Sequence, residues 1–147
     1  YIELMSTNDK ERYYLEKIMN KFKGRQKWRT LEELLTISAD ILLIDDLSNG
    51  VNSTNACNES AIHLAASWGD VEAIDLLVAQ GAAIDEPGDC DCTPLYNAVM
   101  NSNKDAVALL LKLGAAPLSK NDIGFNPYEL AVHYKNQEII QEFIPYV

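Results

Sequence analysis

The sequence predicts an all-α solenoid of about four helix–turn–helix units, preceded by one extra N-terminal helix. Three similar seven-residue segments support this prediction, because they start 33 residues apart, at Ser60, Thr93 and Asn126. A second series, which starts at Leu76 and Leu109 and runs into Gly-Ala, has the same period of 33. Two independent landmarks with one period are typical of a repeat protein, in which each unit packs on its neighbours.

The first segment, residues 1–30, is expected to be a basic helical cap. It holds eight Lys or Arg and four acidic residues, which gives a net charge of +4. Ser6 begins a capping-box pattern, apolar residues follow at helical spacing from Tyr14 to Phe22, and Gly24 closes the segment. Its apolar stripe is expected to pack on the first repeat. The alternative is that its basic face binds a partner or an anionic surface.

The first and last units, residues 31–55 and 122–147, are expected to be degenerate caps. In the first, leucines from Leu31 to Leu47 precede Gly50, which predicts two helices joined by a shortened connection. The last unit ends in an apolar helix that stops before any Gly-Ala pair. Terminal repeats are commonly atypical because one of their sides faces solvent.

The two central units, residues 56–88 and 89–121, carry the clearest helix signals. Thr93 can cap a helix whose first turn contains Pro94, where the missing N–H of proline costs nothing. In the second helices, Leu77 and Leu110 lie on equivalent apolar stripes and are expected to be buried between repeats. Glycine follows each of these helices, at a position that suits a left-handed residue.

These residues resemble the ankyrin repeat, whose unit carries Thr-Pro-Leu-His-x-Ala-Ala, a later Leu-Leu pair and Gly-Ala. The resemblance covers about residues 56–147, and Asn58 and Asp91 stand where the unit's turn glycine is expected. It implies an ankyrin-repeat solenoid that binds proteins through its turn tips and the inner face of its first helices. It implies no catalysis.

The composition excludes several other classes of function. The formal net charge is −10, and no Lys or Arg occurs between Leu31 and Asn103, which disfavours nucleic-acid binding. No apolar run is long enough to span a membrane. Three cysteines, an odd number, favour the reducing cytoplasm. The acidic surface either serves solubility alone or steers a basic partner towards the protein.

Neither the cysteines nor the histidines form a pattern that predicts a metal site or a catalytic centre. Cys57, Cys90 and Cys92 lack the paired spacing of a zinc site and are expected to be free thiols. His63 is expected to be a structural hydrogen-bonding residue, and His133 to face outward. No cofactor is predicted.

The resemblance implies contact positions in the turns and on the first helices of the units. The predicted partner-binding residues are Glu59, Ser67, Trp68, Asp89, Asp91, Met100, Asn101, Ile123, Phe125, His133 and Tyr134. Among them, Trp68, Met100/Asn101 and Tyr134 are expected to line one column across three stacked helices. Such aromatic and apolar anchors are typical of interface hot spots. The alternative for Trp68 is packing against the second helix of its own repeat.

Together these observations predict a non-catalytic, cytoplasmic and monomeric adaptor or inhibitor that captures a basic protein on its acidic concave face. One version is an immunity protein that neutralises a basic toxin or nuclease. The alternative is a scaffolding or targeting segment of a larger effector-type protein. Fold alone does not distinguish these functions.

Overall fold

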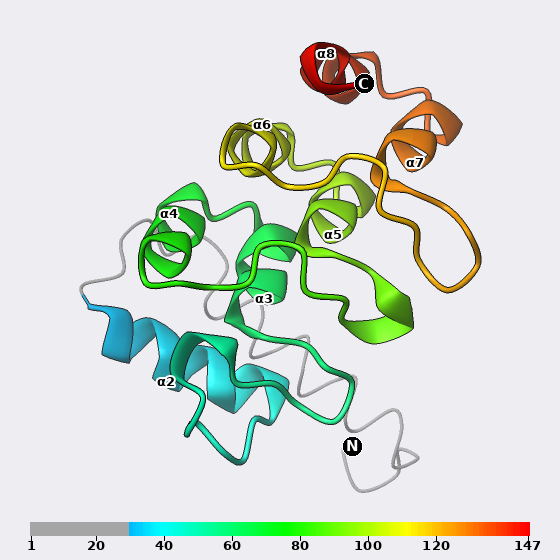
Figure 1. The fold of residues 1–147 in the computed structure, drawn as a ribbon. Coiled ribbons are helices and arrows are strands. Elements are labelled where there is room, and N and C mark those ends of the chain that lie inside the picture. The colour runs from blue at the N-terminus through cyan, green and yellow to red at the C-terminus, as the bar shows by residue number, and fades with distance from the viewer. Residues whose placement is uncertain (1–29) are drawn as a thin grey trace, which may run out of the picture.

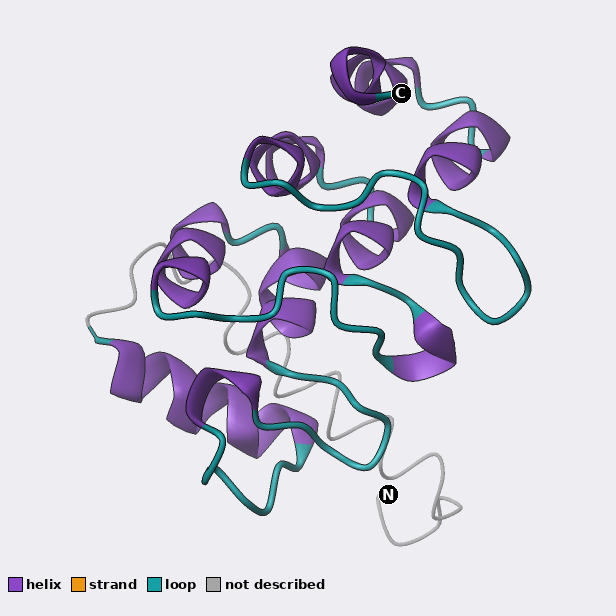
Figure 2. Cartoon of the chain, in the orientation of Figure 1, coloured by secondary structure: helices purple, strands orange, loops and turns teal. Residues whose placement is uncertain are grey.

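A computed structural model describes residues 30–147, and within this range all regular structure is helical (Figure 2). The α-helices are α2 (Leu31–Leu42), α3 (Ala61–Trp68), α4 (Val71–Ala79), α5 (Pro94–Met100), α6 (Lys104–Lys112), α7 (Pro127–His133) and α8 (Gln137–Phe143). Three short 3-10 turns complete the set: η2 (Gly50–Asn52), η3 (Asp89–Asp91) and η4 (Ile144–Tyr146). The predicted N-terminal helix lies outside the described residues.

The helices form two rows, as the 33-residue period predicts. The first helices α3, α5 and α7 begin at residues 61, 94 and 127, and they contact one another in that order. The second helices α4, α6 and α8 begin at 71, 104 and 137 and form a parallel row (Figure 1). The predicted solenoid is therefore confirmed for the described part of the chain.

The core lies between the two rows and is built from equivalent positions. Leu77, Leu110 and Phe143 are 33 residues apart, and all three are completely buried. The small side chains of Ala98 and Ala131 are also fully buried, which lets neighbouring first helices approach closely. Burial of each large side chain contributes roughly 1.5–3 kcal/mol, so stacking of units supplies the stability that one helix pair lacks.

Helix starts and ends follow the sequence signals. Thr93 Oγ1 accepts a hydrogen bond from the N–H of Tyr96 at 3.3 Å, and Pro94 occupies the first turn of α5. Asn126 Oδ1 caps α7 in the same way, with a distance of 2.7 Å to the nitrogen of Glu129. Gly81 and Gly114 follow α4 and α6 with φ angles of 90° and 98°, which glycine adopts at little cost.

The loops that lead into α3, α5 and α7 share one construction and project to the same side of the stack (Figure 1). In each loop, a backbone N–H donates to the carbonyl oxygen four residues later; the pairs are Asn55–Glu59, Gly88–Cys92 and Asn121–Phe125. The residue before the last of each segment has a positive φ: 62° at Asn58, 57° at Asp91 and 85° at Gly124. Asn and Asp tolerate this conformation better than most residues, so the loop shape survives the loss of glycine.

The first unit differs from the prediction. The sequence suggested a second helix through Leu43 and Leu47, and this expectation is wrong. Leu43 ends α2 in the left-handed region, with φ 57°, and Leu47 lies in an exposed turn. Asn52, in η2, instead ties this unit to the next one: its side chain donates to the Gly81 carbonyl at 3.1 Å and accepts from the Ala83 N–H at 2.8 Å.

Candidate functional site

A groove runs between the projecting loops and the first helices. It consists of two hollows of about 380 and 530 Å³ that share Glu59, Ser67 and Asp89 as lining residues. We call these two hollows together the acidic groove. The larger hollow is lined by Glu59, Ser67, Asp89, Cys90, Cys92, Tyr96, Asn97, Met100, Asn121, Asp122 and Ile123. The smaller one adds residues from the end of α2 and from the loop before α3.

Hydrogen bonds between successive loops fix the segments that carry the acidic residues of the groove. The backbone N–H of Asp89 donates to Glu59 Oε1 at 3.1 Å. The backbone N–H of Asp122 donates to the carbonyl oxygen of Cys90 at 3.0 Å. Each loop therefore fixes the next one, and the acidic side chains lie on a structured surface rather than on separate turns.

His63 anchors the same loops from below and is fully buried. The N–H of Ser60 donates to Nδ1 at 3.1 Å, so the ring proton sits on Nε2, which donates to the Glu86 carbonyl at 2.7 Å. Burial lowers the pKa of His63 below its ordinary value, although Glu59 and Glu86 oppose this shift. The predicted structural role of His63 is confirmed by these contacts.

Gly88 fits closely against this arrangement. A Cβ atom at this position would lie 2.8 Å from His63 Nε2 and 3.0 Å from Glu59 Oε1. The contact leaves no space for a side chain. Glycine at position 88 therefore lets the loop that carries Asp89 reach the imidazole beneath it.

The groove is electrostatically negative. Glu59, Asp89 and Asp122 line the larger hollow, and the described residues that line either hollow include no Lys or Arg. The carboxylates of Asp89 and Asp122 are the main causes that raise the pKa of the Cys90 thiol, since they disfavour its thiolate. A lining of this charge is expected to attract cations.

The three cysteines are free: Cys57 and Cys90 are exposed, and Cys92 is buried. Burial raises the pKa of the Cys92 thiol, which makes it a poor nucleophile. Within residues 30–147, no cluster of three or more His, Cys, Asp or Glu is arranged to hold a metal ion. None of the described helices is long and apolar enough to cross a membrane.

The groove brings together five of the sequence-predicted contact residues: Glu59, Ser67, Asp89, Met100 and Ile123. Met100 and Ile123 expose 46% and 73% of their surface, so they offer apolar area beside the carboxylates. Five other predicted residues are exposed but lie outside the groove lining: Asp91, Asn101, Phe125, His133 and Tyr134. The rings of His133 and Tyr134 are 5.9 Å apart.

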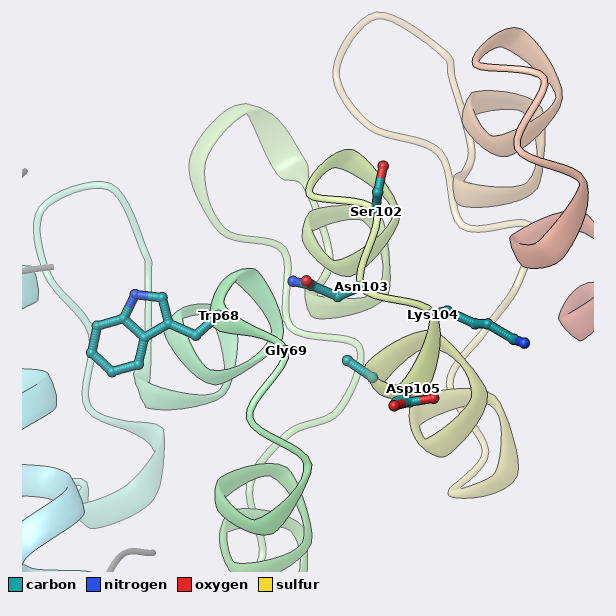
Figure 3. A pocket seen from close by; sticks show the side chains of 7 residues that line it. Trp68, Gly69, Ser102, Asn103, Lys104 and Asp105 are labelled. Carbon is teal, nitrogen blue, oxygen red and sulfur yellow. The ribbon is translucent and has the colours of Figure 1, made fainter. Parts of the chain in front are cut away.

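Trp68 lies apart from this set. It is half-buried and lines a separate hollow of about 340 Å³ with residues of the α5–α6 turn. Figure 3 shows its indole projecting away from Asn103 and Asp105, towards the side of the molecule on which α2 lies. The expected column through Trp68, Met100/Asn101 and Tyr134 is thus divided between the groove, this hollow and the exposed end of α7.

Asn103 occupies the start of α6, beside Trp68, and joins two repeats. Its Nδ2 donates to the carbonyl oxygens of Ala66 and Ser67 at 3.0 and 2.9 Å. The side chain fits against Gly69, where a Cβ atom would lie 2.8 Å from Asn103 Cγ. The sequence offered only a weak signal for this contact, because the equivalent Asp70 and Asn136 cap their own helices.

Sequence reasoning also missed Asn97 and Asn121, which line the larger hollow. A signal for Asn97 was present: the residues 33 positions before and after it are Leu64 and Leu130. A polar residue at a position that is otherwise apolar in the repeat indicates a local function or strain.

Comparison with known proteins agrees with the fold. The family model for ankyrin repeats (3 copies) matches residues 29–122 and 63–146. Rabankyrin-5 of Mus musculus is 30% identical over 87 residues, which cover 58% of this chain and 7% of that protein. The ankyrin repeat protein FPV223 of fowlpox virus (strain NVSL) is 32% identical over 59 residues, or 40% of this chain and 42% of that protein. The chain thus spans less than half the length of either relative. It belongs to the ankyrin repeat family.

Proposed function

We propose that this chain is a non-catalytic adaptor or inhibitor that captures a basic segment of a partner protein in the acidic groove. Ankyrin repeats are generally protein–protein interaction modules, and the family is generally a non-catalytic fold. The observation that supports the choice of partner is the charge of the groove, where Glu59, Asp89 and Asp122 stand among lining residues without Lys or Arg.

Charge and apolar area act on different steps of binding. The carboxylates steer a basic segment into the groove and raise its association rate, an effect that salt screens. Met100 and Ile123 lie beside them and are exposed, so contact with apolar or methylene groups of the partner buries area and slows dissociation. Of the other predicted contacts, Phe125 and Tyr134 are exposed but lie outside the groove lining, and we include them as further contact positions.

The experiment measures binding of two synthetic peptides to the whole chain. One alternates glycine with arginine and lysine, and the other alternates glycine with glutamate. The basic peptide is expected to bind and to shift the NMR signals of groove residues, and its affinity is expected to fall as salt is raised. Binding of the acidic peptide with equal affinity would contradict the proposal.

A matched pair of triple variants separates the groove from the overall charge. Glu59→Gln with Asp89→Asn and Asp122→Asn removes three charges from the groove. Glu72→Gln with Asp105→Asn and Glu138→Gln removes three from equivalent exposed positions in the first turns of α4, α6 and α8. The first variant is expected to weaken the basic peptide about tenfold at low salt, and the second much less. Equal losses would show that net charge, and not the groove, attracts the peptide.

A further inference from the structure

Asn97 places a polar side chain where its own repeat pattern has an apolar one. It lies on α5, and the equivalent residues on α3 and α7 are Leu64 and Leu130. All three are buried, with exposed fractions of 6% for Leu64, 5% for Asn97 and 7% for Leu130. A leucine would therefore suit this position, because its side chain would bury more apolar area there than the amide does.

The side-chain amide of Asn97 makes no hydrogen bond to any described residue. Its backbone is fully engaged: its N–H donates to the Thr93 carbonyl at 3.1 Å, and its carbonyl accepts from the backbone N–H and Nδ2 of Asn101. Asn97 lines the larger hollow of the acidic groove. Although the residue is only 5% exposed, neither amide atom is among the fully buried polar atoms of the described residues that lack a hydrogen bond, so the amide group meets the open space of the hollow. Its donors and its acceptor are therefore available there to a ligand.

The surroundings of Asn97 define the chemistry of that ligand. The carboxylates of Glu59, Asp89 and Asp122 line the same hollow, whereas Met100 and Ile123 supply apolar walls. A fitting group must therefore carry a positive charge, several hydrogen-bond donors and an apolar stem. The volume of about 530 Å³ is large enough for one long side chain and part of the backbone that carries it.

We propose that this hollow receives an arginine side chain from an extended segment of the partner protein. The guanidinium group has five donors in a planar arrangement, so it can donate to the Asn97 carbonyl oxygen and to a carboxylate at the same time. Its methylene stem can cover Met100 or Ile123. A lysine ammonium group carries the same charge, but it is compact and more strongly hydrated, so it satisfies this combination less well. The inference rests on the proposed function, because it names the anchor of the basic segment.

The direct test observes the Asn97 side-chain amide by NMR in the ¹⁵N-labelled, unmutated chain. The probes are three pentapeptides, acetyl-Gly-Ser-Xaa-Ser-Gly-amide, in which Xaa is arginine, lysine or citrulline. The arginine peptide is expected to shift the Asn97 amide signals and to bind about threefold or more tighter than the lysine peptide. The citrulline peptide, which keeps the shape but lacks the charge, is expected to bind weakest.

Asn97→Leu restores the apolar residue of the repeat and gives the second test. It is expected to weaken the arginine peptide about tenfold, because a hydrogen bond to a charged group is lost. It is also expected to raise Tm by about 2–5 °C, because leucine buries more apolar area at a position where Leu64 and Leu130 are buried. Asn49→Leu is the matched control: Asn49 is exposed in the turn before η2 and lies outside the groove lining, so this variant should bind normally.

The outcomes separate this inference from the proposed function. If arginine and lysine peptides bind equally and Asn97→Leu leaves both affinities unchanged, the arginine anchor is wrong while a basic partner stands. If neither peptide shifts any groove signal and the longer basic peptide also does not bind, the proposed function itself is wrong. A shift of the Asn97 amide by arginine alone supports both.

Discussion

Leu77, Leu110 and Phe143 occupy equivalent positions between the two helix rows, and all are completely buried and apolar. Leu64, Asn97 and Leu130 are also equivalent to one another, on the first helices α3, α5 and α7, yet the middle one is polar. The first set keeps one chemistry because every repeat must bury the same face against its neighbour. Under the proposed function, the second set varies because Asn97 meets a partner in the groove rather than a neighbouring repeat. Equivalent positions that differ in chemistry are therefore where function is to be sought in this chain.

The largest expected effect lies in the helix stack. Leu110→Ala should lower the free energy of unfolding by about 2–5 kcal/mol, because it removes buried area and leaves a cavity. Leu77→Ala, at the equivalent position, should cost a similar amount. Urea denaturation followed by circular dichroism measures both. Leu118→Ala is the control, because Leu118 is 53% exposed and should change stability little.

A variant at Asn103 tests whether the contact between repeats adds to this core. Asn103→Ala loses both hydrogen bonds to the end of α3 and should cost about 1–3 kcal/mol. Asn136→Ala, at the equivalent position, loses only a helix cap and should cost about 1 kcal/mol.

Asn103→Asp tests whether a helix cap can replace the contact between repeats, because the Asn103 side chain itself does not cap α6. An aspartate can cap α6, as Asp70 caps α4, but it has no N–H to donate to the Ala66 and Ser67 carbonyl oxygens. A carboxylate oxygen would also face these two carbonyl oxygens without a proton between them, so the variant should be at least as unstable as Asn103→Ala. Stability equal to that of the unmutated chain would show that the contact between repeats contributes nothing.

The period predicted the stack, because features that recur every 33 residues appear in the sequence several times. Thr93, Gly81 and Leu110 each had an equivalent elsewhere in the chain to support them. Features that occur once were predicted poorly. Leu43 is one such feature: leucine favours helices, so nothing in the sequence indicates that it ends α2 in the left-handed region. The reach of Asn103 to the previous repeat depends on how closely the units stack, which composition does not determine.

The sequence predicts only some of the residues that line the groove. Acidic residues in turns, such as Glu59 and Asp89, are predicted because the resemblance implies contacts there. Asn97 was missed because burial usually indicates core, and only comparison with Leu64 and Leu130 separates it from core residues. Trp68 is among the predicted contact residues because a large aromatic residue suggests a hot spot. The direction of its indole, however, depends on how α3 ends, which the sequence does not indicate.

The buried histidine makes the free energy of unfolding depend on pH. In the unfolded chain His63 titrates near 6.5, and burial lowers its pKa in the folded protein. Between these two values the unfolded chain binds more protons, so acid favours unfolding. The contribution of neutral His63 to stability is therefore complete above pH 6.5 and is lost as the pH falls through the window below it. Urea denaturation at a series of pH values measures this loss.

His63→Gln is the variant that isolates this effect, because other groups also titrate in acid. Glutamine keeps hydrogen-bonding capacity without a proton-binding group in this range. The difference in stability between the unmutated chain and His63→Gln should shrink as the pH falls below 6.5. A difference that stays constant with pH would mean that His63 titrates in the folded protein as it does in the unfolded chain.

The smallest expected effect on stability concerns the carboxylates beside Cys90. Asp89→Asn with Asp122→Asn should leave Tm within about 2 °C, because both residues are exposed and far from the core. The same double variant should lower the pKa of the Cys90 thiol, because the carboxylates of Asp89 and Asp122 are the main groups that raise it. The measurement is the pH dependence of the reaction of Cys90 with a thiol reagent. Cys57 is first replaced by serine so that it does not react, and Cys92 is protected because it is buried. A midpoint that moves to lower pH, with Tm unchanged, would show that the groove concentrates negative charge without contributing to the stack. An unmoved midpoint would remove the electrostatic basis for a basic partner, and the apolar contacts of Met100 and Ile123 would then have to explain any binding.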